Sequence, residues 1–160
     1  MLFERIVGNV ERGYVPPEPA DVLDVEWHDL ARRAIRRASR SGRRVGVLLP
    51  RGVFARHGDV LHGDAGYLQI NLLPADVLIA IPADANEMGL IALTLGNMHV
   101  PAQVSGGELV VAADAPAEAL FRREKVAFAT DRRRFEPSRL APEADVALAE
   151  GFELQRPSNQ

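Results

Sequence analysis

Short apolar runs separated by turn residues make up the first half of the chain. Val22–Trp27, Arg43–Leu49 and Tyr67–Leu73 each have the length and composition of a β-strand. Turn-forming clusters lie between them, including Ser41-Gly42 shortly before the second run. Several short strands at this spacing predict a small all-β domain, either a sandwich or a barrel.

The second half alternates between strand-like and helix-like patterns. Asp84, with Glu87 three residues later, predicts a capped helix over 85–95 that stops at Gly96-Asn97. Four strand-like runs and a second helical segment complete the pattern: strands at Val77–Ile81, Gln103–Val104, Leu109–Ala112 and Val126–Thr130, and a helix at Pro116–Lys125. This β-α-β-β-α-β order is typical of the ferredoxin-like fold.

The change of pattern predicts an α+β protein with a domain boundary near Pro74. Residues 1–74 are expected to form an N-terminal all-β domain, followed by a ferredoxin-like βαββαβ domain over residues 75–137. Residues 138–160 are polar, with scattered acids and prolines, and are expected to form a mobile tail.

Residues 30–40 fit two different patterns. Leu30, Ala34 and Ile35 recur with the period of an amphipathic helix, and arginines occupy many of the remaining positions. The strand-like runs on both sides instead favour a β-hairpin that turns at Ser41-Gly42. The period alone predicts a helix and the context predicts a strand, so the two patterns together leave the choice open.

Composition narrows the classes of function. The 160 residues are 47% hydrophobic and 26% charged, which is the balance of a packed protein. No apolar run approaches the ~20 residues that span a bilayer, and the N-terminus lacks the features of a secretory signal, so we expect a cytoplasmic protein with no membrane partner. The absence of cysteine excludes disulfides and thiol catalysis. No nucleophile elbow, phosphate loop or zinc-protease motif is present, so nothing indicates an enzyme.

Seven arginines lie between Arg32 and Arg44, although the net charge of the chain is −3. Such a run forms a surface for phosphates, a surface for an acidic protein partner, or a solvated face. No aromatic residue interrupts the run after Trp27, so stacking on nucleic-acid bases is not supported. The acidic overall balance also gives no general case for binding nucleic acid.

The chain has four histidines, and each has a different setting. His28 ends a strand-like run and is expected at the surface. His57 and His62 flank a turn region, where they either reach a shared ion or face solvent. His99 follows the stop of the first predicted helix in apolar surroundings, so a half-buried histidine is its simplest interpretation.

The first predicted helix suggests a second interpretation of His99, as a residue at a subunit interface. It carries Ile91 and Leu95 on one face and Leu90 and Leu93 on another, and both apolar faces must be buried. The sheet of a small domain covers only one face, so the other is a candidate subunit interface. Across a two-fold axis there, His99 would meet its copy. Two imidazoles facing each other form a candidate binding site for nickel, copper or zinc.

The segment Gly96–Gln103 reads G-N-M-H-V-P-A-Q and resembles the signature G-N-R-H-x-P-x-Q of the urease accessory protein UreE family, which are nickel metallochaperones. Further segments resemble the family in order and spacing, so that the similarity covers about residues 1–137. They are Met1–Asn9, Trp27 with the arginine run, Leu49–Gly52, Gly58–Leu61 and Phe135–Pro137.

The resemblance implies a homodimer that forms through the C-terminal domain, with His99 as the shared metal ligand at its centre. It implies a carrier that delivers Ni²⁺ for assembly of the urease active site, with Zn²⁺ or Cu²⁺ as possible ions in vitro. The implied partners are the urease accessory GTPase and the complex of urease apoprotein with its accessory proteins. It also implies an N-terminal all-β domain, a ferredoxin-like C-terminal domain, and a strand at Arg32–Arg40.

Three positions or segments depart from the family pattern. Met98 replaces the arginine of the signature, and we expect its side chain to pack rather than to ligate. Ala113 and Ala115 stand where many members carry a His-x-His pair, so that second metal site is expected to be absent. Residues 138–160 hold no histidine, which argues against bulk nickel storage. Carboxylates of this tail are candidate additional ligands: Glu143, Asp145, Glu150 and Glu153.

Two other functions stay open from the sequence. The missing histidines fit a metal-independent interaction module of the urease maturation complex. The arginine run fits a polyanion- or RNA-binding protein, whose binding would weaken steeply with salt.

Overall fold

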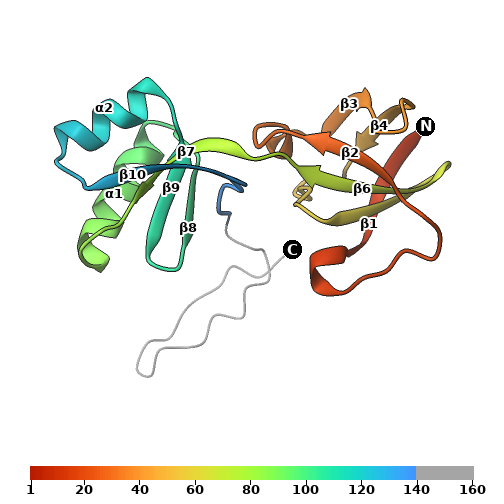
Figure 1. Cartoon of the computed structure of the whole chain (residues 1–160), viewed down its shortest axis with the longest axis horizontal. Coiled ribbons are helices and arrows are strands. Elements are labelled where there is room, and N and C mark those ends of the chain that lie inside the picture. Colours follow the sequence, from red (N-terminus) through yellow and green to blue (C-terminus); the bar gives the residue numbers. More distant parts are fainter. Residues whose placement is uncertain (140–160) are drawn as a thin grey trace, which may run out of the picture.

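The computed structural model describes residues 1–139 and arranges them in two lobes, each built on one β-sheet (Figure 1). Six strands form the N-terminal sheet, in the order β2-β6-β5-β1-β4-β3. They are β1 (Leu2–Asn9), β2 (Asp21–Val25), β3 (Ala34–Ala38), β4 (Arg44–Leu48), β5 (Asp59–Gly63) and β6 (Gly66–Leu72), with short 3₁₀ turns at Val10–Arg12 and Asp29–Ala31.

The N-terminal sheet curls towards a barrel. Strands β2 and β3 stand at opposite ends of the strand order, yet the Arg40 amide just after β3 donates to the Val22 carbonyl of β2 at 2.8 Å. The curl encloses a core of alternate strand residues, with Phe3, Leu23 and Ile70 almost fully buried. The expected N-terminal all-β domain is confirmed.

Residues 34–38 form a strand, so the helical period of residues 30–40 predicts the wrong element. In β3, which pairs antiparallel with β4, only Ile35 is buried. The hairpin closes where the Ser39 amide donates to the Arg43 carbonyl at 2.9 Å, and Gly42 supplies the required left-handed backbone with φ +80°. Spaced alanines among arginines imitate an apolar helix face, whereas the ladder with β4 decides the structure. The strand implied by the family resemblance is confirmed.

The C-terminal sheet has the order β10-β7-β9-β8, with every neighbouring pair antiparallel. Two helices complete the predicted ferredoxin-like arrangement. The elements are β7 (Ala75–Ala80), α1 (Ala85–Asn97), β8 (Ala102–Ser105), β9 (Glu108–Ala112), α2 (Ala115–Arg123) and β10 (Phe128–Arg133). Residues 1–139 include no helix that is long and apolar enough to span a membrane.

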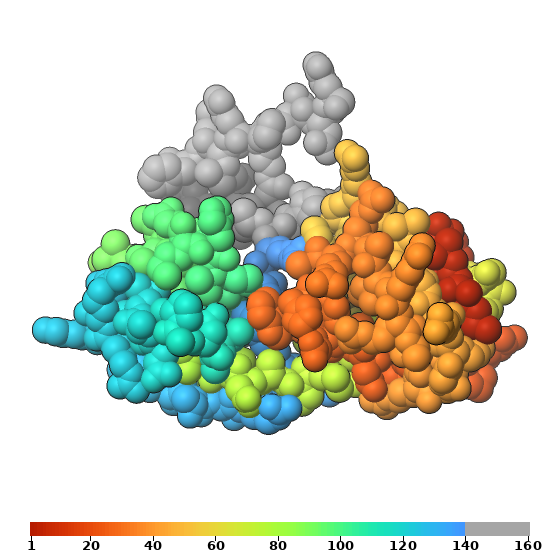
Figure 2. All heavy atoms as spheres, turned by 90° about the horizontal axis from the view of Figure 1, so that it is seen from above, coloured from red at the N-terminus to blue at the C-terminus, as the bar shows by residue number. Residues whose placement is uncertain are grey.

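The two faces of the C-terminal sheet pack against different parts of the protein. Leu78 and Leu109 pack under α1 and α2, whereas Val77 and Val110 on the other face pack with Phe135. Trp27 of the N-terminal lobe joins this second cluster, and its ring meets that of Phe135 edge to face at 5.2 Å. The second face is therefore buried against the joint between the lobes, where Figure 2 shows the last described segment in blue.

The chain passes from one sheet to the other between Leu72 and Ala75. The proposed boundary at Pro74 stays a prediction, as does the mobile tail. Ser138, its first residue, donates its amide to the Ala102 carbonyl of β8 at 2.8 Å. Residues 140–160 lie outside the described part of the chain.

Candidate metal centre

Helix α1 positions His99, and local hydrogen bonds fix where this helix begins. The Glu87 amide donates to Asp84 Oδ1 at 2.8 Å, and the Ala83 amide donates to Glu87 Oε2 at 2.5 Å. This is the predicted capping arrangement, with the return bond shifted to the residue before the cap.

The C-terminal end of α1 is a Schellman motif with His99 in the left-handed position. Two amides turn back into the helix: His99 donates to the Gly96 carbonyl at 3.0 Å and Val100 to the Leu95 carbonyl at 2.9 Å. His99 has φ +56°. The helix ends at Asn97 and therefore includes the Gly96-Asn97 pair that the sequence predicts as its stop, and the residue with positive φ is this histidine and not a glycine.

The backbone at His99 is conformationally expensive. Within residues 1–139, only His99 and Lys125 combine a side chain with positive φ. A left-handed residue with a Cβ costs about 1–2 kcal/mol, although histidine tolerates it better than branched residues do. The chain accepts this cost at the residue that the sequence analysis selects as a ligand.

The outward side of the helix that leads to His99 is apolar and exposed in the single chain. Leu90 is 66% exposed and Leu93 is 63% exposed on α1, and Met98 beside the histidine is 43% exposed. Ile91 on the opposite side of the helix is buried. The expectation of two apolar faces is confirmed, whereas the expectation that Met98 packs rather than ligates stays a prediction.

Two glycines extend the exposed apolar side of α1, which we call the α1 outer face and define as Gly89, Leu90, Leu93 and Gly96. A Cβ built on Gly89 or Gly96 would meet no atom within 4 Å. Each glycine weakens a helix by about 1 kcal/mol relative to alanine. No contact among residues 1–139 requires these glycines, whereas a second helix packed closely on this face would.

One subunit does not complete a metal site by itself among residues 1–139. These residues contain no group of three or more histidine, aspartate or glutamate side chains that could hold an ion. Ala113 and Ala115, at the positions of the family's histidine pair, offer no donor side chain. An ion at His99 would therefore take further ligands from a second copy, from water or from carboxylates elsewhere.

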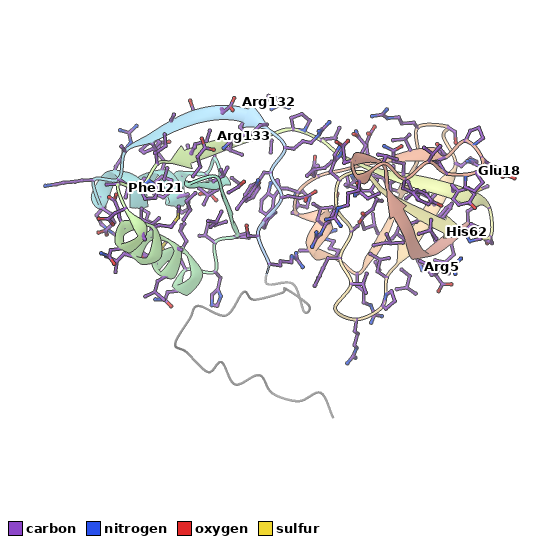
Figure 3. The ribbon with its side chains drawn as sticks, turned by 90° about the horizontal axis from the view of Figure 1, so that it is seen from below. Arg5, Glu18, His62, Phe121, Arg132 and Arg133 are labelled. Carbon is purple, nitrogen blue, oxygen red and sulfur yellow. The ribbon has the colours of Figure 1, made fainter. Side chains whose placement is uncertain are left out.

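The remaining histidines have their own partners. His57 Nδ1 accepts from the Leu72 amide at 3.1 Å, and the His57 amide donates to Glu136 Oε1 at 2.6 Å, which ties His57 into the joint between the lobes. The His62 ring packs on Tyr67 with centroids 5.0 Å apart. Figure 3 shows His62 on the lobe opposite that of Phe121, a residue of α2. Residues 1–139 contain no group of three or more metal-ligating side chains, so a shared ion at His57 and His62 finds no support.

His28 lies beside Glu26, with its Nε2 3.1 Å from the carboxylate, and its side chain is exposed. The expectation of a surface position for this histidine is confirmed.

The arginine run is largely neutralised by aspartates that sequence reasoning missed. Arg40 contacts both oxygens of Asp24, and this hydrogen bonding lowers the pKa of Asp24. Burial raises the pKa of Asp21, but hydrogen bonds from Ser39, Ser41 and other donors outweigh burial and lower it overall. These contacts are separated by 16 to 22 positions along the chain, so no local pattern predicts them.

Fold and site together define a two-domain α+β protein whose ferredoxin-like lobe presents one histidine at the end of an exposed apolar helix. Residues 3–71 match the family model described as UreE urease accessory protein, N-terminal domain, and residues 75–151 match that of the C-terminal domain. The chain therefore belongs to the UreE family of urease accessory proteins.

Individual relatives agree with the family models. The chain is 36% identical over 137 residues to a urease accessory protein UreE of Bacillus cereus, covering 83% of this chain and 91% of the relative. It is 30% identical over 135 residues to a urease accessory protein UreE of Geobacillus kaustophilus, covering 84% and 91% of the two chains.

Proposed function

We propose that the chain is a homodimeric metallochaperone that carries Ni²⁺ for urease maturation. In this proposal the α1 outer faces of two subunits meet, and the two His99 side chains hold one ion between them. Membership of the urease accessory family supports the pathway. The observation that carries the metal proposal is the exposed, left-handed His99 at the end of an apolar helix face that the other residues between 1 and 139 leave uncovered.

The donor set fits a carrier that must release its ion. Two imidazoles occupy two positions of the metal, and water or carboxylates supply the rest. Glu143, Asp145, Glu150 and Glu153 remain candidate ligands, although they lie outside the described residues. Because only the neutral imidazole ligates, acidification should release the ion. Zn²⁺ and Cu²⁺ suit the same imidazoles and are expected to compete in vitro.

The proposed partners follow from the family. A carrier of this kind hands Ni²⁺ to the complex of urease apoprotein with its accessory proteins, in cooperation with the urease accessory GTPase. A cytoplasmic location, without membrane or nucleic-acid partners, stays part of the proposal.

The test combines nickel calorimetry with mass measurement by light scattering on the full chain. We expect a dimer that binds one Ni²⁺ per two chains. One ion per chain on a monomer would contradict the shared site. A stable dimer that binds no Ni²⁺ would instead support a metal-independent interaction module, the function favoured by Ala113 and Ala115.

A further inference from the structure

The arginines of the hairpin formed by β3, β4 and the turn between them divide into two sets with different environments. Those that face β2 and the adjoining turn are paired: Arg37 with Asp29 at 2.9 Å, Arg40 with Asp24 at 2.7 Å and Arg43 with Asp21 at 3.0 Å. In contrast, Arg36 and Arg44 form no ion pair or side-chain hydrogen bond with any residue between 1 and 139.

The strand register brings the two unpaired arginines to one face. Arg36 lies opposite Gly46, and Arg44 lies opposite Ala38, so the arginines are diagonal neighbours on the outer side of the hairpin. The other two corners of this square hold the smallest side chains. No large side chain therefore covers the guanidinium groups, and the surface between them is a shallow depression.

The arginines border a groove of about 650 Å³ that also reaches the start of β1. Met1 is 51% exposed and Leu2 is 41% exposed along its wall. Gly46 forms part of the lining, and a Cβ on it would come within 3.5 Å of the Leu2 side chain. The groove thus combines two free cations with an open apolar edge.

We propose that this groove docks a short acidic segment of a partner protein, which places carboxylates on Arg36 and Arg44 and an apolar side chain against Met1 and Leu2. A guanidinium binds a carboxylate through two parallel hydrogen bonds, so the pair recognises carboxylates geometrically as well as by charge. The surface belongs to the N-terminal lobe, and the inference does not depend on the metal proposal.

A nucleic acid fits the same groove less well. Asp64 also lines it, with Oδ1 accepting from the Leu2 amide, but its charge disfavours carboxylates and phosphates alike and does not decide between them. The described lining has no aromatic ring for bases to stack on. The neighbouring arginines that would lengthen a basic track already hold aspartates.

The probe is a fluorescein-labelled peptide of alternating glutamate and leucine, measured by anisotropy with the full-length protein. Comparison probes are the same peptide with serine for leucine, and single-stranded DNA of equal charge. The test variant is Arg36→Thr with Arg44→Thr, which keeps strand-compatible residues. The control, Arg33→Thr with Arg51→Thr, removes two exposed arginines outside the groove.

We expect the test variant to bind the glutamate-leucine peptide about tenfold more weakly, since two exposed charge-assisted contacts are lost. The control variant should change less than twofold, and the serine peptide should bind the unmodified protein more weakly than the leucine peptide. Equal losses in both variants, no binding by the unmodified protein, or tighter binding of DNA than of peptide would each overturn the proposal. Nickel binding should be the same in all three proteins.

Discussion

The two helices of the C-terminal lobe end in the same backbone motif but in different surroundings. At the end of α2, Lys125 has φ +57°, and the Val126 amide donates to the Phe121 carbonyl at 2.9 Å. At the end of α1, His99 has φ +56° and Val100 makes the equivalent bond to Leu95.

The difference between the helices lies in what each exposes. Lys125 is a cation beside a helix C-terminus, where positive charge is favourable, and the α2 surface carries a Glu118–Arg122 ion pair at 2.6 Å. The last turn of α1 has no basic residue, and its outer face shows leucines to solvent. The end of α2 has favourable partners within its subunit, whereas residues 1–139 leave the α1 outer face exposed, where the proposed interface would cover it.

The largest expected effect is a loss of nickel affinity that occurs on substitution of His99 but not on substitution of Lys125. His99→Gly should weaken nickel binding at least ~100-fold, because loss of groups that merely orient a ligand already costs 10- to 100-fold. Lys125→Gly makes the same backbone change on α2 and should leave the affinity unchanged. Calorimetric titration of both variants beside the unmodified protein measures this.

Similar affinities for His99→Gly and the unmodified protein would remove His99 from the site. A parallel loss in Lys125→Gly would show that the lobe as a whole, and not the imidazole, had been disturbed.

The next largest expected effect is on dimer affinity, and it compares an aspartate placed on the exposed surface of α1 with one placed on the exposed surface of α2. Leu93→Asp places a carboxylate in the proposed interface and should raise the dimer dissociation constant about 30-fold or more. Ala119→Asp introduces the same side chain at an exposed position of α2 and should leave the dimer intact. Sedimentation velocity over a concentration series distinguishes these outcomes. Dissociation by both variants would mean that the interface is not confined to α1.

Local patterns predict much of the fold of this lobe. Asp84 and Asp114 cap the helices that the sequence places after them, because a side-chain cap depends on neighbours only three residues away. Residues 34–38 are mispredicted by periodicity because their state depends on pairing with β4. Local composition cannot show that such a ladder exists.

The sequence selects His99 as the candidate ligand but does not predict the backbone geometry around it. Two apolar helix faces and the helix stop are enough to select His99. The sequence offers Gly96 as the natural left-handed residue, yet the turn comes three positions later. Val100 then packs with the core under α1, and this tertiary contact sets the position of the turn.

A smaller effect concerns the glycines of the α1 outer face. Gly96→Ala adds a methyl group that meets no atom of residues 1–139 within 4 Å and should strengthen the helix. In a close-packed interface, the same methyl group should weaken the dimer by about 1–3 kcal/mol. Opposite changes in helix stability and dimer affinity would therefore support close contact at Gly96. An unchanged dissociation constant would place this residue outside the interface.

The smallest expected effect is the change in the free energy of unfolding when either left-handed residue, His99 or Lys125, is replaced by glycine. Glycine relieves the positive φ at either site, while its greater freedom in the unfolded chain offsets part of the gain. His99→Gly and Lys125→Gly should each raise the free energy of unfolding by up to about 1 kcal/mol, with less for Lys125, whose charge favours the helix end. Urea denaturation in metal-free buffer, at a fixed protein concentration, measures both.

Whether His99→Gly raises or lowers the free energy of unfolding shows whether the imidazole packs in the dimer interface. The change caused by Lys125→Gly carries no such information. If the imidazole contributes no packing, relief of strain dominates and His99→Gly gains at least as much stability as Lys125→Gly. If the imidazole is buried against the partner in the metal-free dimer, its loss outweighs that relief. The stability of His99→Gly then falls below that of the unmodified protein as protein concentration rises, whereas that of Lys125→Gly does not. Such a divergence would locate His99 in the interface before any metal is added.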